Sequence, residues 1–311
     1  MEQPSSQGRG QRQGQGRGPG QGQDRGRKQP AGRAETAVRG NPPGELSRPA
    51  AAAPPPRRFD GHGVLITGAG RGIGEATARR LAEEGARVLV TDLDERRAAT
   101  AAGTIPGAVA LGCDVRDRAS VEAAVAYAVD TFGTLDVLVN NACSCTPDAP
   151  LFEDEPDEVW ARDLDTTLTG AFRCARAALP HLVASGRGAI VTVGSVNGAQ
   201  DFGNHAYSAA KAGLASLTRT LAGHASPRGV RVNLVEPGTV RTDAWADREA
   251  ELARAAAHYP MGRVGTPQDI AAAVAFLASS DAAWITGVTL PVDGGLLMSN
   301  VGLRRAFGTT G

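Results

Sequence analysis

The sequence predicts an α/β domain built on one doubly wound parallel sheet, and two observations carry that prediction. From Gly63 onward, short apolar runs of three to six residues alternate with longer stretches that are rich in Ala and Leu. Most of these runs do not alternate between apolar and polar residues, which is typical of strands buried on both faces. Strands that alternate with helices form a parallel sheet with helices on both sides.

The expected elements follow one another along the chain without an internal repeat. The expected strands are 64–66, 88–90, 109–111, 137–139, 190–193, 230–235 and 288–290, and the expected helices are 72–84, 118–132, 157–184, 206–225 and 267–279. No break divides this part of the chain, and its length suits one large domain. We therefore expect a single domain of about seven strands over residues 59–311.

The first 58 residues differ in kind from the rest. They contain no aromatic residue and are dominated by Gly, Gln, Pro, Arg and Ala. They hold eleven basic and four acidic side chains, a net charge of +7, and because the whole chain is neutral, residues 59–311 carry −7. Such a segment cannot bury enough apolar surface to offset the entropy of ordering it. We predict a disordered basic extension over residues 1–58.

Composition excludes several classes of protein. No apolar run reaches the roughly 18 residues that cross a bilayer, and no secretory signal can be read at the N-terminus. Cys143 and Cys145 suggest a metal or redox pair, but no second Cys/His pair at ligand spacing completes a metal site. With Cys113 and Cys174, they are too few for a disulfide framework in a chain of this length. We expect free thiols, no bound metal and a cytoplasmic protein.

A glycine-rich turn joins the first expected strand to the first expected helix. Glycines at such a turn let the backbone bend tightly and approach a pyrophosphate, and the helix N-terminus adds free N–H groups and a partial positive charge. The spacing is Gly68-x-x-x-Gly72-x-Gly74, because Ile73 breaks the strict G-x-G-x-x-G pattern. We predict that this turn binds the phosphates of a nucleotide through Gly68, Arg71, Gly72, Ile73 and Gly74.

Asp92 follows the second expected strand, 24 residues after Gly68. A carboxylate at that point accepts hydrogen bonds from both hydroxyls of an adenosine ribose and repels a 2′-phosphate. This favours NAD(H) as the cofactor. Arg71, Arg96 and Arg97 lie close by in the sequence and leave NADP(H) open as the alternative.

Tyr207 and Lys211 lie four residues apart in an expected helix, so both side chains point to the same side. A nearby ammonium favours the phenolate and is expected to lower the pKa of Tyr207 from about 10, which suits proton transfer near neutral pH. Composition supports a special role for Lys211. Of the 33 basic residues, 31 are Arg, and the only other lysine is Lys28. A chain so biased toward Arg indicates that a compact ammonium is needed at position 211.

Other polar residues stand at or just after the ends of expected strands. Gly68, Asn140, Ser195 and Glu236 all occupy such positions. Ligands of doubly wound sheets bind beyond the carboxyl ends of the strands, so we expect one crevice to contain these residues. A hydroxyl at Ser195 would orient a carbonyl or alcohol oxygen there.

With these residues assembled, the chain resembles the short-chain dehydrogenase/reductase family, in its single-domain branch of about 250 residues with a Rossmann-type fold. The resemblance runs from about Gly61 to Gly295. It rests on motifs in the order that the family has them, namely Thr67–Gly74, Asp114-Val115, Asn140-Asn141-Ala142, Ser195, Tyr207-x-x-x-Lys211, Val232-Asn233, Pro237–Thr242 and Val292–Gly295.

The resemblance implies hydride transfer between a substrate carbon and a nicotinamide, with Tyr207 as general acid/base. Lys211 would hold the nicotinamide ribose, and Ser195 would position the substrate oxygen. The further cofactor contacts that it implies are Asp92 with the adenosine ribose, Asp114 and its neighbour Val115 with the adenine, Asn141 with the cofactor backbone, and Val240 and Thr242 with the carboxamide. Members are often homodimers or homotetramers, which implies contacts through the helices at 157–184 and 206–225.

Three residues depart from the family pattern. Thr167 stands where the family usually has a fourth catalytic residue, an Asn, and its side chain cannot supply an amide. Cys143 replaces the usual Gly after Asn-Asn-Ala and adds a thiol near the nicotinamide. Glu236 replaces a small residue, and its carboxylate either reshapes the substrate end of the site or points to water.

The expected substrate walls are residues 239–262, which contain Trp245 and Tyr259, and the loop 197–205. Such mixed lining fits a sugar, a polyol or a small ketone. One alternative is a nucleotide-binding protein with weak or no catalysis, which Thr167 and Glu236 motivate. Another gives the main role to the basic extension as a segment that binds RNA or an anionic surface, but the extension lacks aromatic residues for base stacking. We expect only non-specific binding of polyanions by that extension, and no membrane partner.

Overall fold

The structure, a computed structural model, describes residues 57–308. The predicted disordered extension therefore lies outside the described residues up to residue 56. Its last two residues, Arg57 and Arg58, are described, and Arg58 is tied to the folded part. The Arg58 guanidinium donates to the Glu84 carboxylate at 2.6 Å and to Asp281 at 2.9 Å. The described fold thus begins two residues before the expected boundary.

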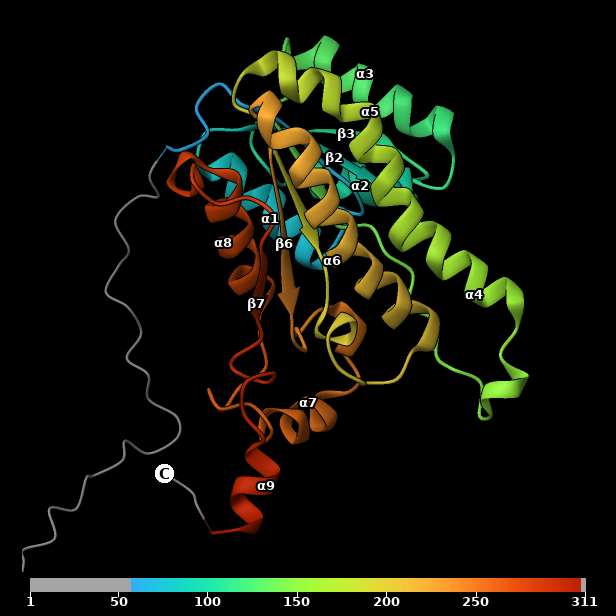
Figure 1. Ribbon diagram of the computed structural model, residues 1–311. Coiled ribbons are helices and arrows are strands. Elements are labelled where there is room, and N and C mark those ends of the chain that lie inside the picture. Colours follow the sequence, from blue (N-terminus) through green and yellow to red (C-terminus); the bar gives the residue numbers. More distant parts are fainter. Residues whose placement is uncertain (1–56, 309–311) are drawn as a thin grey trace, which may run out of the picture. The chain divides into compact units, whose positions relative to one another are not determined.

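Seven parallel strands form one sheet in the order β3-β2-β1-β4-β5-β6-β7, which confirms the predicted doubly wound sheet (Figure 1). The reversal of strand order lies between β1 and β4. The strands are β1 (Gly63–Ile66), β2 (Arg87–Asp92), β3 (Val109–Gly112), β4 (Val137–Asn140), β5 (Ala189–Val193), β6 (Arg231–Pro237) and β7 (Thr289–Val292). Each contains most or all of a predicted apolar run. The five inner strands are buried almost throughout, whereas the edge strands β3 and β7 are only partly buried.

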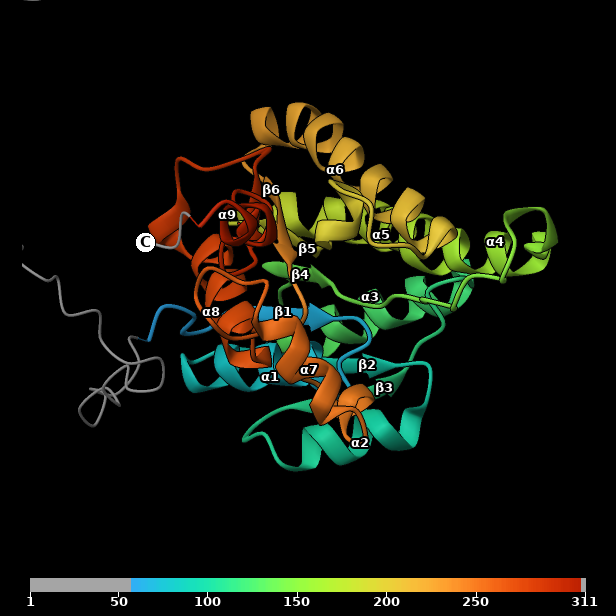
Figure 2. The same ribbon diagram turned by 90° about the horizontal axis from the view of Figure 1, so that it is seen from below.

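Helices cover both faces of the sheet (Figure 2). One apolar cluster joins the sheet to α1, α2 and α8, and a second joins it to α3, α5 and α6. The helices are α1 (Gly72–Glu83), α2 (Glu95–Gly103), α3 (Arg118–Phe132), α4 (Asp157–Leu164), α5 (Gly170–Ser185), α6 (His205–Ala225), α7 (Glu249–Ala256), α8 (Pro267–Ala278) and α9 (Val301–Ala306). Within residues 57–308, none of them is long and apolar enough to cross a membrane.

Two details of the helices differ from expectation. The helix expected over 157–184 is interrupted by a turn of π-helix at Asp165–Thr169, which separates α4 from α5. Helices α2, α7 and α9 were not expected. Helix α2 buries only alanines, so it carries no strong apolar periodicity, and it begins where the Asp94 side chain accepts hydrogen bonds from two N–H groups of its first turn.

Candidate active site

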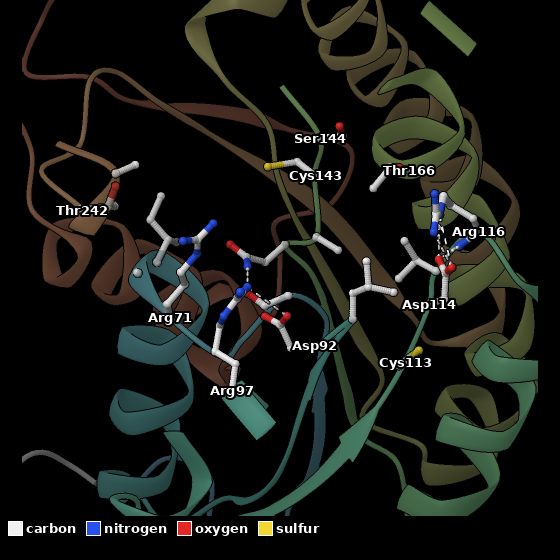
Figure 3. Close-up of a pocket in the computed structure, with 18 of the residues that line it drawn as sticks. Arg71, Asp92, Arg97, Cys113, Asp114, Arg116, Cys143, Ser144, Thr166 and Thr242 are labelled. Carbon is white, nitrogen blue, oxygen red and sulfur yellow. Dashed lines mark hydrogen bonds and ion pairs between the residues drawn. The ribbon is translucent and has the colours of Figure 1, made fainter. Parts of the chain in front are cut away.

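Two adjoining cavities lie beyond the carboxyl ends of the strands. The first, of about 440 Å³, lies against the glycine-rich turn and the ends of β2, β3 and β4, and we call it the glycine-loop cavity (Figure 3). The second, of about 920 Å³, lies against the ends of β5 and β6, the start of α6 and the segment around α7, and we call it the tyrosine cavity. The two share the lining residues Ile73, Asn141, Cys143, Thr242 and Ala244.

The glycine-rich turn has the shape that the sequence predicted. Gly68 has a φ of +61°, and a Cβ there would lie 2.8 Å from the Cα of Ala142. A Cβ on Gly74 would lie 2.6 Å from both the Asn141 side chain and the Gly68 carbonyl. Helix α1 begins at Gly72 without a side-chain cap, so the N–H groups of its first turn remain available at the cavity. This backbone fits the phosphates of a dinucleotide.

Asn141 braces the glycine-rich turn. Its side-chain amide donates to the carbonyl oxygens of Thr67 at 3.1 Å and Gly68 at 2.8 Å. In return, the Thr67 hydroxyl oxygen accepts from the backbone N–H groups of Asn141 and Ala142, both at 3.1 Å. Because the amide is committed to the turn, its direct action is to hold the loop in shape at the cavity wall.

Asp92 lies at the end of β2 and lines the glycine-loop cavity, with only 7% of its surface exposed. Its carboxylate accepts from the N–H groups of Gly70 at 3.2 Å and Asp94 at 3.1 Å, and Arg97 lies 3.4 Å away. Arg71 and Arg97 also line the cavity, but Arg96 lines neither cavity. One acid and two cations thus face the place where an adenosine ribose is expected.

Asp114 and Val115 line the far end of the glycine-loop cavity, where an adenine was expected. The Asp114 carboxylate pairs with Arg116 at 2.7 Å, and this pairing lowers the pKa of the carboxyl (Figure 3). Val115 is buried against Gly170, where an added Cβ would lie 2.7 Å from its side chain.

Ser195, Tyr207 and Lys211 line the tyrosine cavity together, as do Val240 and Thr242. Lys211 is 2% exposed, and its ammonium donates to the Val193 carbonyl at 2.6 Å and lies 5.2 Å from the centre of the Tyr207 ring. The Ser195 hydroxyl donates to the Asn197 side chain at 3.1 Å. Strand β5 and helix α6 therefore bring the three predicted side chains to one wall.

The expected direction of the Tyr207 pKa shift is wrong in this structure. Burial raises the pKa of the phenol, and the neighbouring Cys143 charge adds to that rise more than a hydrogen bond with Ser195 offsets it. Burial also lowers the pKa of Lys211, which weakens the ammonium that was expected to favour the phenolate. The protonated phenol at neutral pH is suited to donating a proton.

Thr167 lines neither cavity, although the resemblance implied that it stands at the place of a fourth catalytic residue. It lies buried in the π-helical turn, and its hydroxyl makes two hydrogen bonds with the backbone of Ser144. It accepts from the Ser144 N–H at 3.1 Å and donates to the Ser144 carbonyl at 3.2 Å. The Thr167 side chain therefore holds the chain after β4 in place and offers no group to the cavities.

The expected crevice contains Gly68 and Ser195, but Asn140 and Glu236 line neither cavity. Asn140 is buried and donates to the Ala171 carbonyl at 3.5 Å. Glu236 is 5% exposed, so the alternative in which it points to water is wrong. Burial and the nearby Asp293 carboxylate raise the pKa of Glu236.

The two expected substrate walls do border the tyrosine cavity. The segment 239–262 contributes Trp245 and Tyr259, and the loop 197–205 contributes Phe202 among others. The Tyr259 hydroxyl oxygen accepts from the Thr239 N–H at 2.7 Å, which fixes that ring at the cavity wall. Among the further lining residues, Pro147 and Leu296 lie outside the predicted walls, because loops from separate elements bring them to the cavity.

Comparisons with known proteins show the family to which the chain belongs. Residues 68–297 match the family model described as enoyl-(acyl carrier protein) reductase. The chain is 45% identical over 239 residues to cis-4-hydroxycyclohexanecarboxylate dehydrogenase of Sinomonas cyclohexanicum, covering 75% of this chain and 95% of that protein. It is 42% identical over 244 residues to the 3-oxoacyl-(acyl-carrier-protein) reductase of Escherichia coli, covering 77% and 99%.

Solved structures agree as well. A crystal structure of an oxidoreductase of the short-chain dehydrogenase/reductase family from Burkholderia thailandensis superposes with a TM-score of 0.74. The two sequences are 38% identical, and the match covers 80% of this chain and 98% of that one.

Proposed function

The chain belongs to the short-chain dehydrogenase/reductase family, and we propose that it is an NAD(H)-dependent enzyme that interconverts an alcohol and a carbonyl compound. The family's oxidoreductases bind NAD(P)(H). The observation that carries the proposal is the position of Ser195, Tyr207 and Lys211 on one cavity that adjoins the glycine-loop cavity. A cofactor and a substrate would meet where the two cavities share residues.

The preference for NAD(H) rests on Asp92. Its carboxylate lies in the cavity wall, where it would accept hydrogen bonds from ribose hydroxyls and repel a 2′-phosphate. The nicotinamide supplies the site that accepts or donates the hydride. The chain would hold the cofactor with the N–H groups at the start of α1, with Lys211, and with Val240 and Thr242.

Tyr207 would move the proton of the substrate oxygen. Because its phenol is protonated at neutral pH, it would donate a proton to a carbonyl oxygen directly, and it would accept one from an alcohol more readily as the pH rises. The Ser195 hydroxyl would orient that oxygen toward Tyr207. Lys211 would act from behind the ring, where the Val193 carbonyl holds its ammonium.

The lining of the tyrosine cavity supports a small hydroxylated or keto substrate, such as a sugar, a polyol or a ketone. Aromatic and apolar surface comes from Phe202, Trp245 and Leu296, and polar groups come from Asn197 and Asn204. The names of two relatives fit this class, since one is a dehydrogenase named for a hydroxylated ring and the other a reductase named for an oxo group.

A homo-oligomer is part of the proposal. Trp160 on α4 and Phe172 on α5 are 42% and 44% exposed, and both lie on the helices through which the resemblance implies contacts between copies. A second copy of the chain would cover them.

A second candidate is a nucleotide-binding protein with weak or no catalysis. It is favoured by Thr167, which has no free group for a proton relay because its hydroxyl is bonded to Ser144. It predicts cofactor binding without turnover of any alcohol or carbonyl compound.

The test is absorbance at the NADH band with NAD⁺ or NADP⁺ against sugars, polyols and secondary alcohols, and with carbonyl compounds in reverse. We expect faster turnover with NAD⁺, and we expect Tyr207→Phe to lower it about 10²- to 10⁴-fold while NADH still binds. Full activity of Tyr207→Phe would contradict the mechanism. Faster turnover with NADP⁺ would contradict the role of Asp92, and NADH binding without any turnover would favour the second candidate.

A further inference from the structure

Two free thiols, Cys143 and Cys145, face the tyrosine cavity on the chain after β4. Both are exposed, whereas Ser144 between them and Thr146 after them are half-buried. This alternation indicates a chain that is locally extended, with both thiols on one side. In Figure 3 the side chains of Cys143 and Ser144 point in different directions. No third His, Cys, Asp or Glu joins them as a metal site in the part of the chain that the structure describes.

Hydrogen bonds to buried side chains hold Ser144, the residue between the two thiols, in place. The Ser144 hydroxyl donates to the Asp163 carboxylate at 2.5 Å, and its backbone N–H and C=O both bond the Thr167 hydroxyl. Asp163 also accepts from the Thr146 N–H at 2.8 Å. Asp163 is 1% exposed and Thr167 is also 1% exposed, so these bonds hold the pair against the protein interior while the sulfurs stay open to the cavity.

The two thiols lie next to the proposed proton donor. Cys143 and Cys145 line the same cavity as Tyr207 and Lys211, and their thiolates, when formed, raise the pKa of both groups. Cys143 also lines the glycine-loop cavity, so it lies where the two cavities meet. Any group attached to these sulfurs would occupy space between the cofactor side and Tyr207.

We propose that Cys143 and Cys145 form a reversible thiol-modification site that reacts with low-molecular-weight disulfides such as glutathione disulfide and thereby reshapes the wall of the tyrosine cavity. The Cys143 thiolate attacks one sulfur of the small disulfide, forms a mixed disulfide and releases one thiol, which takes up the proton that Cys143 lost. Cys145 then attacks the Cys143 sulfur, forms the Cys143–Cys145 bond and releases the second thiol. The two protein thiols are oxidised, and the small disulfide is reduced to two thiols.

The geometry of the chain makes the Cys143–Cys145 disulfide strained and therefore easy to reduce. Residues two apart in an extended chain have Cα atoms about 6.6 Å apart, near the upper end of the range of about 4.4–6.8 Å for disulfides. Closing the bond therefore bends the chain at Ser144 and pulls it away from Thr167 and Asp163. Strained disulfides have high reduction potentials, which is the property of reversible regulatory ones. Partial burial raises the pKa of Cys145 to about 11, so little of it is thiolate at neutral pH and its attack on the mixed disulfide is the slower step.

The chemical part of this inference is independent of the proposed function, and only the effect on turnover depends on it. The test therefore reads the thiols themselves. The full chain is incubated with glutathione disulfide, digested, and mapped by mass spectrometry. We expect a peptide that has lost two hydrogen atoms through a Cys143–Cys145 bond, and restoration by dithiothreitol. NAD⁺ added beforehand should slow the reaction, because Cys143 lies where the cavities meet.

Two variants separate the steps. Cys145→Ala should stop at the mixed disulfide on Cys143, and Cys113→Ala/Cys174→Ala, which removes the two buried thiols, should react as the wild type does. If turnover is found, the protein with the Cys143–Cys145 disulfide should lose on the order of tenfold to a hundredfold in kcat/KM, because the chain beside Tyr207 has shifted. The inference is overturned if the mapped bond involves Cys113 or Cys174, or if neither Cys143 nor Cys145 reacts.

Discussion

The two cavities of this protein are built in different ways. The glycine-loop cavity is lined by the turn after β1 and by strand ends whose polar groups are already bonded to one another, as Asn141 is to Gly68 and Asp92 to Gly70. The tyrosine cavity is lined by β5, α6 and loops that follow β4 and β6. It is lined by aromatic side chains, namely Phe202, Tyr207, Trp245 and Tyr259, whereas no aromatic side chain of the described residues lines the glycine-loop cavity.

The shape of the glycine-loop cavity depends on the backbone, and the shape of the tyrosine cavity depends on side chains. Around the glycine-rich turn, backbone atoms approach so closely that an added Cβ meets main chain. Around Tyr207, side chains from several elements determine the shape, and one of them can change without moving a strand. We expect cofactor binding to be lost through backbone changes on one side, and turnover or specificity to change through side chains on the other.

The largest effect in the glycine-loop cavity should come from Gly74→Ala. The new Cβ would lie 2.6 Å from the Asn141 side chain and the Gly68 carbonyl, so the turn must shift. We expect NADH affinity to fall on the order of a hundredfold and the free energy of unfolding to fall by about 1–3 kcal/mol. Fluorescence titration with NADH and denaturant unfolding measure the two effects.

Gly223→Ala in α6 is the matched control, since a Cβ there meets nothing within 4 Å. It should leave NADH affinity unchanged and stabilise the helix by about 0.5–1 kcal/mol. Unchanged NADH affinity in Gly74→Ala would show that the turn is not the phosphate site.

The glycine-loop cavity and the tyrosine cavity also differ in how much of each could be predicted from the sequence. The glycine-rich turn and Asp92 belong to short, contiguous motifs whose spacing follows from the strand and helix that they join. The Tyr207–Lys211 pair shares one helix face, so local spacing was again sufficient. The position of the Thr167 side chain outside both cavities could not be predicted, because its partner, Ser144, is 23 residues away and the π-helical turn that orients its hydroxyl has no spacing signal. The direction of the Tyr207 pKa shift depends on burial, which spacing does not report.

A smaller effect on the cofactor side should come from Asp92→Asn. The amide keeps the size of the side chain but removes the charge that would repel a 2′-phosphate, beside Arg71 and Arg97. We expect the ratio of kcat/KM with NADP⁺ to that with NAD⁺ to rise on the order of tenfold to a hundredfold. Asp94→Asn is the control, because Asp94 lies outside both cavities and Asn also caps a helix well. An unchanged ratio in Asp92→Asn would remove the basis of the NAD(H) preference.

Thr167→Val tests whether the tyrosine cavity depends on a side chain that does not reach it. The substitution keeps the shape but leaves the Ser144 N–H and carbonyl without the hydroxyl that bonds them. We expect a loss of about 1–3 kcal/mol in unfolding free energy. Turnover should fall about tenfold while NADH affinity is nearly unchanged, because the chain beside Tyr207 loosens. Thr167→Ser, which retains the hydroxyl, should behave like the wild type. Equal losses in both variants would point to packing instead of these hydrogen bonds.

The smallest effect concerns the charge buried where β6 ends. Burial and Asp293 raise the pKa of Glu236, and no basic side chain pairs with it within residues 57–308. The native state therefore holds the proton more tightly than the unfolded state, and its ionised form costs stability increasingly as the pH rises above the unfolded pKa of about 4.3.

Glu236→Gln removes this titration. We expect the variant to be more stable than the wild type at pH 7, by on the order of 1 kcal/mol, and this gain should disappear as the pH falls below about 4.3. Thermal unfolding at both pH values measures it, with the exposed Glu83→Gln on α1 as the control. A gain of the same size at both pH values would assign the effect to packing. A gain confined to neutral pH would show that ionisation of Glu236, which has no basic partner among the described residues, costs stability at this end of the sheet. Asp92 at the glycine-loop cavity differs, because its carboxylate accepts hydrogen bonds from Gly70, Asp94 and Arg97.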